Sequence, residues 1–280
     1  MNGNLKSVCK KTLGMKAIML VAGAGIRLRQ LGTEPPPKVL LRFGGKSLLQ
    51  RHIEILKRIG IRELVLGVGY QQEKIMQEVA NLGAEKFVKT VYNEDYELGN
   101  IVTLWVLRDE LAGGRPALLM DGDILYDERI VQRLVASRHE NCVLLDRSSV
   151  LDDEQVKLCI KNGKIIEFRK WLSVEGDFCG ESVGMFKLSP HVVETLIAQT
   201  RLYIHQARRN DPYEEAIRDV ILTSPRGMFA YEDITGLPWI EIDFAKDIER
   251  ANNEILPRLD AVESDGLSAV GPERRLQTIQ

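Results

Sequence analysis

A run of five apolar residues followed directly by four small ones constrains the fold of this chain most. Residues 17–21 are all apolar, as is typical of a central strand that is buried on both faces. Ala22, Gly23, Ala24 and Gly25 follow, and such small side chains let backbone N–H groups curl around an anionic oxygen. The segment therefore predicts a strand that leads into a phosphate-binding loop.

Strands and amphipathic helices alternate after this loop. Apolar residues recur at helical spacing over residues 47–59 and 71–82, and expected strands lie at residues 63–68 and 86–91. This alternation predicts a parallel sheet with right-handed crossovers. We therefore predict an α/β fold of Rossmann-like type, in which helices flank a mixed, mostly parallel central sheet.

The pattern changes beyond residue 125. Asn162-Gly163 stands between two apolar runs, which is a strong hairpin signal. A further strand is expected over residues 179–188, before a helix that begins at Pro190. This part is expected to be smaller and antiparallel. Residues 15–257 are predicted to form a single domain, with residues 1–14 as an N-terminal extension and residues 260–280 as a disordered tail.

Composition argues against several classes of protein. The 38 basic and 40 acidic residues give a net charge of −2, so we expect no nucleic-acid partner that is held by bulk charge. We expect no membrane partner either, because no stretch has the length of apolar residues that a membrane span needs. The 4 cysteines contain no Cys-x-x-Cys pattern, so neither a disulfide scaffold nor a zinc site is predicted, and a cytoplasmic location fits best. The sequence leaves the oligomeric state open.

Basic residues follow the glycines of this loop in the sequence. Arg27, Arg29 and Lys38 supply planar forks and a mobile point charge, both of which suit phosphate oxygens. The segment lacks the Gly-x-x-x-x-Gly-Lys-Ser/Thr of a P-loop, and Leu28 stands where a dinucleotide-binding fingerprint has its third glycine. A small-residue turn that serves only tight packing remains the alternative.

Two pairs of acidic residues follow other expected strands. Asp121 and Asp123 end the apolar run that starts at residue 117. Glu241 and Asp243 alternate with isoleucines, so that these two acids share one face of a strand. Carboxylates at the carboxyl edge of a sheet are costly unless a cation lies near them, and Mg²⁺ prefers such oxygen ligands. The alternatives are that the first pair forms a turn and that Asp243 caps a helix.

These landmarks together resemble a known family. Ala-Gly-x-Gly-x-Arg-Leu followed by Pro-Lys is similar to the signature of the nucleotidyltransferases that make sugar nucleotides and related activated alcohols from an NTP and a phosphomonoester. The resemblance extends over about residues 15–257 and implies the fold of the nucleotide-diphospho-sugar transferases. It implies that Asp123 and Asp243 hold Mg²⁺ and that Arg27 and Lys38 offset the charge of the reacting phosphates. Residues 22–25 are expected to bind the nucleotide, and so are Asn100 and Asp121.

The acceptor is expected to bind to the antiparallel part. The candidates are Glu181, Gly184, Tyr213 and Glu214, and aromatic faces for an ammonium group are offered by Trp171, Tyr213 and Trp239. Core or surface roles remain open for all of them. Residues 96–107 resemble the corresponding loop and helix of cytidylyltransferases that act on phosphocholine, inositol phosphate or aminoethylphosphonate.

The resulting interpretation is a Mg²⁺-dependent cytidylyltransferase that joins CTP to a small phosphate or phosphonate acceptor and releases pyrophosphate. A sugar-1-phosphate uridylyl- or thymidylyltransferase is one alternative, and a non-catalytic nucleotide sensor of the same fold is another. One departure from the family is Ile26, which stands where Ser or Thr is usual.

Overall fold

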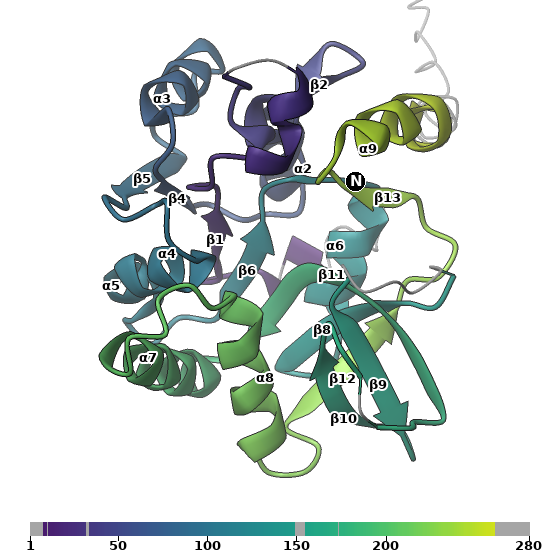
Figure 1. Cartoon of the computed structure of the whole chain (residues 1–280). Helices are drawn as coiled ribbons and strands as arrows, with labels where there is room; N and C mark the ends of the chain where they lie inside the picture. Colours follow the sequence, from purple (N-terminus) through teal and green to yellow (C-terminus); the bar gives the residue numbers. More distant parts are fainter. Residues whose placement is uncertain (1–7, 10, 32–33, 149–154, 173, 261–280) are drawn as a thin grey trace, which may run out of the picture.

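The computed structural model of the chain describes residues 8–9, 11–31, 34–148, 155–172 and 174–260. Within these residues one sheet of nine strands runs through the molecule (Figure 1). In one half of the sheet all neighbours are parallel, in the order β6 (Ala117–Asp121), β1 (Lys16–Leu20), β4 (Leu64–Val68) and β5 (Val88–Tyr92). The predicted Rossmann-like arrangement is confirmed.

The other half is mostly antiparallel, as expected. It contains β8 (Asn141–Asp146), β9 (Lys157–Lys161), β10 (Lys164–Arg169), β11 (Phe178–Leu188) and β12 (Phe229–Asp233). Strand β11 pairs antiparallel with β6, β8 and β9, and so joins the two halves. Asn162 and Gly163 both have positive φ angles, which is the geometry of the type I′ hairpin turn between β9 and β10.

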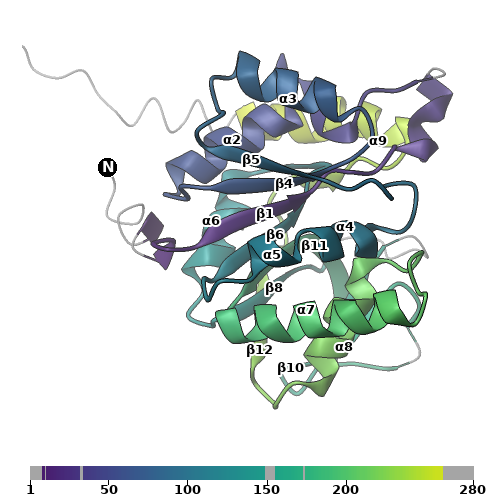
Figure 2. The same ribbon diagram turned by 90° about the vertical axis from the view of Figure 1, so that its left-hand side faces the viewer.

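Helices cover both faces of the sheet, as Figure 2 shows for α2 and α3 on one side and α4, α7 and α8 on the other. Along β1, Ala17 and Met19 face one apolar core, whereas Ile18 and Leu20 face the second. The first core is closed by α2 (Leu48–Arg58), α3 (Gln72–Asn81) and α6 (Glu128–Ala136). The second is closed by α4 (Asn100–Val106), α5 (Arg108–Leu111), α7 (Pro190–His205) and α8 (Tyr213–Thr223). A strand buried on both faces explains the continuous apolar run.

A third, smaller core lies beside the main sheet. The sequence predicted its strand at Glu241 and the helix after Asp243, but not the strand that pairs with the first. Strands β7 (Ile124–Tyr126) and β13 (Trp239–Glu241) form an antiparallel ribbon, and β2 (Arg42–Phe43) pairs with β3 (Lys46–Ser47). Helix α9 (Ala245–Arg250) and the π-helical turn η3 (Ala251–Ile255) pack on them through Ile240, Ile242 and Ala251. This small core positions the segment that carries Asp243.

The expected domain boundaries differ from the structure at both ends. Val8 is 3% exposed within the first core, and the Thr12 hydroxyl donates to the carbonyl oxygen of Ile59 at 2.9 Å. Val8 and Thr12 therefore pack on the domain, although residues 1–14 were expected to lie outside it. Leu259 is also buried. Most of the expected C-terminal tail, residues 261–280, lies outside the described residues.

The expectation that the cysteines form no disulfide is wrong for one pair. Cys159 on β9 and Cys179 on β11 are joined by a disulfide, since they stand directly opposite each other in the antiparallel pairing. Spacing along the sequence does not reveal such a pair, because the strand register brings the two residues together. The disulfide also removes the cysteine argument for a reducing compartment. Cys9 and Cys142 are free thiols.

This bond is expected to stabilise the antiparallel half. The two cysteines are 20 positions apart, and closing a loop of that size is worth about 3 kcal/mol of unfolding free energy. The double variant Cys159→Ala/Cys179→Ala should lose about that amount in denaturant unfolding, and Cys9→Ala should not. Wild-type protein that unfolds at the same denaturant concentration with and without reductant would contradict the expectation.

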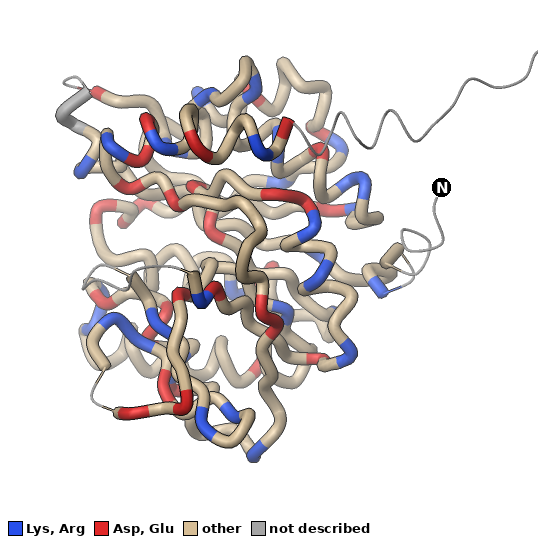
Figure 3. Tube along the Cα trace, turned by 90° about the vertical axis from the view of Figure 1, so that its right-hand side faces the viewer, with Lys and Arg blue, Asp and Glu red and all other residues tan. Residues whose placement is uncertain are grey.

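Charge and hydropathy of the described residues agree with the composition. Figure 3 shows Lys and Arg interspersed with Asp and Glu over the side of the molecule that it presents. Among the helices of the described segments, none has the length and apolar character that crossing a membrane requires.

Candidate active site

Three chain segments meet at the carboxyl ends of β1 and β6. The loop after β1 contributes the glycines and Arg27, the turn after β6 contributes Asp123, and the segment after β13 contributes Asp243. The backbone N–H of Ile242 donates to the carbonyl oxygen of Asp123 at 2.9 Å, continuing the β7–β13 ribbon. This ribbon brings together two aspartates that are 120 positions apart in the sequence.

Lys38 connects these aspartates. Its Nζ lies 2.9 Å from Asp123 Oδ2 and 2.6 Å from Asp243 Oδ1, and Arg27 lies 2.9 Å from the other oxygen of Asp243. Burial alone would lower the pKa of Lys38, but the two carboxylates outweigh burial and raise it. Burial would likewise raise the pKa of Asp243, but Lys38 and Arg27 lower it. Lys38 and Asp243 are therefore charged at neutral pH.

The local structure explains how Lys38 reaches this position. It begins the short 3₁₀ turn η2 (Lys38–Leu40), which follows Pro37 and is anchored by buried Val39. A Cβ added at Gly25 would lie 3.4 Å from Lys38 Cγ, so the lysine stem passes directly over that glycine. Gly25 also has a φ of +57°, a conformation that other residues rarely adopt. Gly25 thus leaves space for the Lys38 side chain and also lines the cavity.

The carboxylates here can hold a divalent cation. One oxygen each from Asp123, Glu241 and Asp243 lies within 4.8 Å of the other two. An all-oxygen set of carboxylates that faces a polar cavity suits Mg²⁺, which keeps several waters and shares phosphate ligands. Helix capping does not account for Asp243, because the Asp247 side chain accepts the N–H groups of Asp243 and Phe244 at 3.0 and 2.7 Å.

A cavity of about 760 Å³ opens in front of these groups. Most residues predicted to contact the nucleotide or metal line it: Gly23, Ala24, Gly25, Arg27, Lys38, Asn100, Asp123 and Asp243. Ala22 does not; it is 3% exposed, and its carbonyl oxygen accepts the N–H of Tyr70 at 3.0 Å. Ile26, the departure from the family pattern, lines the cavity and is 62% exposed.

Asp121, Tyr213 and Gly184 form one unit beneath the site. The Tyr213 hydroxyl donates to Asp121 Oδ2 at 2.9 Å, and a Cβ at Gly184 would collide with the same carboxylate. Burial and the charges of Glu214 and Asp123 raise the pKa of Asp121 well above its usual value. Tyr213 is fully buried, so it does not contact an acceptor as predicted. Gly184 is explained by the space that Asp121 needs, and Asp121 supports the site from below.

Asn100 holds the start of α8. Its Oδ1 accepts the backbone N–H of Tyr213 at 2.7 Å, so it caps α8 and not α4, which it begins. A Cβ at neighbouring Gly99 would lie 2.6 Å from backbone atoms of Asn210 and Asp211. This close contact places the loop before α8 against the start of α4. Asn100 thus has a structural role in addition to its expected contact with the nucleotide.

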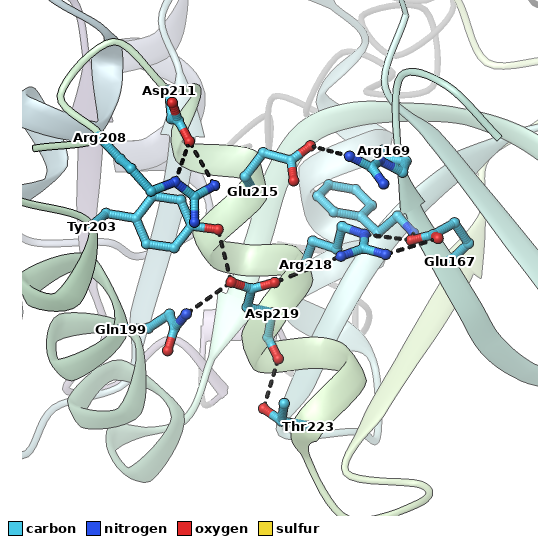
Figure 4. A network of polar contacts seen from close by, with 11 residues as sticks. Glu167, Arg169, Gln199, Tyr203, Arg208, Asp211, Glu215, Arg218, Asp219 and Thr223 are labelled. Carbon is cyan, nitrogen blue, oxygen red and sulfur yellow. Dashed lines mark hydrogen bonds and ion pairs between the residues drawn. The ribbon is translucent and has the colours of Figure 1, made fainter. Parts of the chain in front are cut away.

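Charged contacts fix the rest of α8, as Figure 4 shows. Arg218 binds both oxygens of Glu167 on β10, at 2.6 and 2.9 Å. Asp219 accepts from Tyr203 and Gln199 of α7, at 2.7 and 2.8 Å. Helix α8 is therefore held between the antiparallel strands and α7, which keeps Tyr213 and Glu214 in place.

A second cavity, of about 440 Å³, meets the first at Asp243, which lines both. The predicted acceptor residues Glu181 and Trp239 line it, together with Asp146 and Glu241. The Trp239 Nε1 donates to Asp146 Oδ2 at 2.7 Å, which holds the indole ring in place. Trp171 lines neither cavity and is 64% exposed.

Glu214 is expected to make stability depend on pH. It lines neither cavity, its Oε2 is buried without a hydrogen-bond partner, and burial raises its pKa from 4.5 to about 6. The folded protein then binds this proton more tightly than the unfolded chain, so the free energy of unfolding falls as pH rises through that window. The fall should be about 2 kcal/mol. Denaturant unfolding at several pH values should show a steeper fall for wild type than for Glu214→Gln; equal slopes would contradict it.

One further residue supports the site, and its role could not be predicted from the sequence. His52 of α2 is buried beneath the turn that precedes Asp123, with Nε2 3.1 Å from the carbonyl oxygen of Gly122 and Nδ1 3.3 Å from the Tyr126 hydroxyl. Burial lowers the pKa of His52 to about 4, so the ring is neutral. The ring supports the turn. In the sequence, His52 stands among the apolar positions of a helix, and this spacing gives no sign of such a role.

Comparison with known proteins shows which family this chain is similar to. Residues 17–176 match the family described as the MobA-like NTP transferase domain. The CTP:phosphoglutamine cytidylyltransferase of Campylobacter jejuni is 27% identical over 256 residues, covering 84% of this chain and 98% of the relative. The choline-phosphate cytidylyltransferase of Streptococcus pneumoniae is 38% identical over 99 residues, covering 35% of this chain and 41% of the relative. Mannose-1-phosphate guanylyltransferases also occur among the relatives.

Solved structures share the fold. The inositol-1-phosphate CTP transferase from T. maritima superimposes with a TM-score of 0.71 at 21% identity, covering 89% of this chain and 97% of that protein. The family match alone spans 160 of the 280 residues, and the relatives named above are all nucleotidyltransferases. This chain therefore belongs to the family of MobA-like NTP transferase domains and is an enzyme of the nucleotidyltransferase type.

Proposed function

We propose that this enzyme transfers CMP from CTP to a small phosphorylated or phosphonylated acceptor and releases pyrophosphate. The observation that carries the proposal is the meeting of two cavities at Asp243, which Lys38 contacts at 2.6 Å. The larger cavity lies against the glycine loop and suits the nucleotide. The smaller one lies on the far side of Asp243 and suits the acceptor. Cytidylyltransferases among the relatives support CTP as the donor.

The residues present fit a Mg²⁺-dependent reaction. Asp123, Glu241 and Asp243 would hold the ion, which would neutralise charge on the phosphates when bound. Arg27 and Lys38 would bind the α-phosphate region and offset the charge that grows as an acceptor oxygen attacks. No nucleophilic side chain is required, because a phosphate or phosphonate oxygen is already ionised, so the protein's task is positioning and charge stabilisation.

The second cavity favours an acceptor that carries an ammonium group. Asp146, Glu181 and Glu241 place carboxylates around it, and the Trp239 ring adds an aromatic face. Ammonium groups bind to such surroundings through ion pairing and contact with the ring. Lys246 and Arg250 of α9 line the same cavity and suit the acceptor's phosphate. The phosphocholine-like substrates expected from the sequence fit this arrangement.

Pyrophosphate release tests the proposal. CTP, UTP, dTTP, ATP and GTP would each be combined with phosphocholine, phosphoethanolamine, 2-aminoethylphosphonate, inositol 1-phosphate, glucose 1-phosphate and mannose 1-phosphate. We expect release with CTP and an ammonium-bearing acceptor. Release with GTP and mannose 1-phosphate would favour the guanylyltransferase function of other relatives, and UTP or dTTP with glucose 1-phosphate a sugar-nucleotide synthase. Release with no pair would favour a nucleotide sensor.

Glu181→Gln should separate acceptor recognition from nucleotide binding. Glu181 is 8% exposed and lines the acceptor cavity, and losing one charged contact there should raise the KM for an ammonium-bearing acceptor by about tenfold or more. The KM for CTP should not change, because Glu181 does not line the nucleotide cavity. Steady-state kinetics with each substrate varied in turn measure both values; equal effects on the two KM values would contradict the assignment.

A further inference from the structure

The ammonium group of Lys38 lies among the carboxylates assigned to Mg²⁺. It is 2.9 Å from Asp123 Oδ2 and 2.6 Å from Asp243 Oδ1. Both aspartates belong to the set of three carboxylates whose oxygens lie within 4.8 Å of one another. The side chain of Lys38 is only 18% exposed, so the group is enclosed in this position. A tethered cation thus already satisfies two of the three candidate metal ligands.

A divalent ion cannot take the lone pairs of these two oxygens to which the ammonium donates while Lys38 stays in place. Mg²⁺ needs its oxygen ligands at about 2.0–2.1 Å in near-octahedral geometry, so an ion that took those lone pairs would lie almost in contact with Lys38 Nζ. Two cations at that separation repel each other, and the hydrogens of the ammonium point at the lone pairs that the metal needs. One of the two cations must move away.

We propose that Lys38 competes with the divalent cation for Asp123 and Asp243 and withholds these carboxylates until a triphosphate draws its ammonium group away. This inference rests on the metal assignment in the proposed function. It adds a second role to Lys38: as a positioning residue, it holds the two aspartates in place before substrate binds. The metal and the triphosphate would then bind cooperatively, since each favours the same displaced position of Lys38.

The surroundings of Lys38 allow this movement. Its stem passes over Gly25, which has no side chain to confine it, and Lys38 lines the same cavity as Gly23 and Gly25. The ammonium can therefore turn from the aspartates toward phosphate oxygens at the glycine loop without a change in the backbone. Lysine suits this exchange, because its charge sits on a flexible four-carbon stem, whereas arginine prefers one planar, two-pronged contact.

Direct binding of Mn²⁺, a paramagnetic substitute for Mg²⁺, tests the competition without any turnover. Lys38→Met should bind Mn²⁺ at least about thirtyfold more tightly than wild type in electron paramagnetic resonance titrations, because it removes an ammonium held by two charge-assisted hydrogen bonds. Arg27→Met is the matched control. It removes an equal charge 2.9 Å from Asp243, but this side chain is 45% exposed, so Mn²⁺ affinity should rise less than about fivefold.

A second variant guards against loss of structure. Lys38→Arg keeps a cation at the position, so its Mn²⁺ affinity should stay as weak as that of wild type, and circular dichroism would confirm the fold of all three variants. Equal gains in Lys38→Met and Arg27→Met would overturn the competition, since net charge alone would then explain them. Unchanged or weaker binding by Lys38→Met would also overturn it. Binding by none of the proteins would overturn the competition and the metal assignment together, whereas pyrophosphate release tests the transferase function separately.

Discussion

Asp123→Asn is expected to lower the rate of pyrophosphate release by at least about a hundredfold and to leave the fold intact. The substitution removes a charge from the set of carboxylates assigned to the metal and from the ion pair with Lys38. Losing one such electrostatic contribution typically costs a factor of about 10²–10³ in rate. Initial rates at saturating CTP and acceptor, with circular dichroism spectra of each protein, measure both effects.

The control and a companion variant make this result specific. Asp109→Asn changes a carboxylate that is 82% exposed on α5, so its rate should equal that of wild type. Asp243→Asn should lose about as much activity as Asp123→Asn, and the double variant should lose little more, because residues that act as one unit are not additive. An Asp123→Asn enzyme with rates within tenfold of wild type would refute the metal assignment.

Gly184→Ala is expected to destabilise the protein by about 2–4 kcal/mol. Gly184 has a φ of +64°, and an added Cβ would collide with Asp121. Strained backbone costs about 1–3 kcal/mol and overpacking costs a similar amount. Asp121 would have to turn away and lose the hydrogen bond from Tyr213. The free energy of unfolding from denaturant titration measures the loss.

Gly163→Ala separates the two contributions. Gly163 has a similar φ of +69°, but a Cβ there would meet nothing within 4 Å. This variant should therefore lose only the backbone cost, about 1 kcal/mol. The difference between the two variants reports the collision with Asp121. Equal losses would show that Asp121 adapts freely and that Gly184 is required only for its backbone conformation.

Much of the α/β framework could be predicted, because the signals involved are local. A buried central strand needs an apolar run, and residues 17–21 supply one; the type I′ turn needs Asn162-Gly163, and the structure has it. Helix α2 begins after Ser47, whose hydroxyl accepts the N–H of Gln50 at 3.1 Å, and its apolar spacing marked it. Each of these features depends on neighbours within a few residues.

The features that the sequence did not reveal depend on contacts between distant segments. Strand β7 has only three residues, too few for a periodic pattern, and its antiparallel pairing with β13 joins segments that are distant in the sequence. The disulfide between Cys159 and Cys179 depends on strand register. Tyr213 was expected at the acceptor because aromatic residues suit ammonium groups, but packing against Phe186 and the hydrogen bond to Asp121 bury it.

By itself, the sequence determined the family, and it predicted a phosphate-binding loop and two aspartates as metal ligands, because spacing and residue type carry that information. Only the tertiary structure decided that Asp123 and Asp243 meet, that Lys38 lies between them, and that Asn100 and Tyr213 build the site from below. The physical reason is the distance along the sequence over which each interaction acts. Backbone propensities and side-chain periodicity act within a few residues, whereas an ion pair between residues 38 and 243 exists only after the sheet and the β7–β13 ribbon have brought the two segments together.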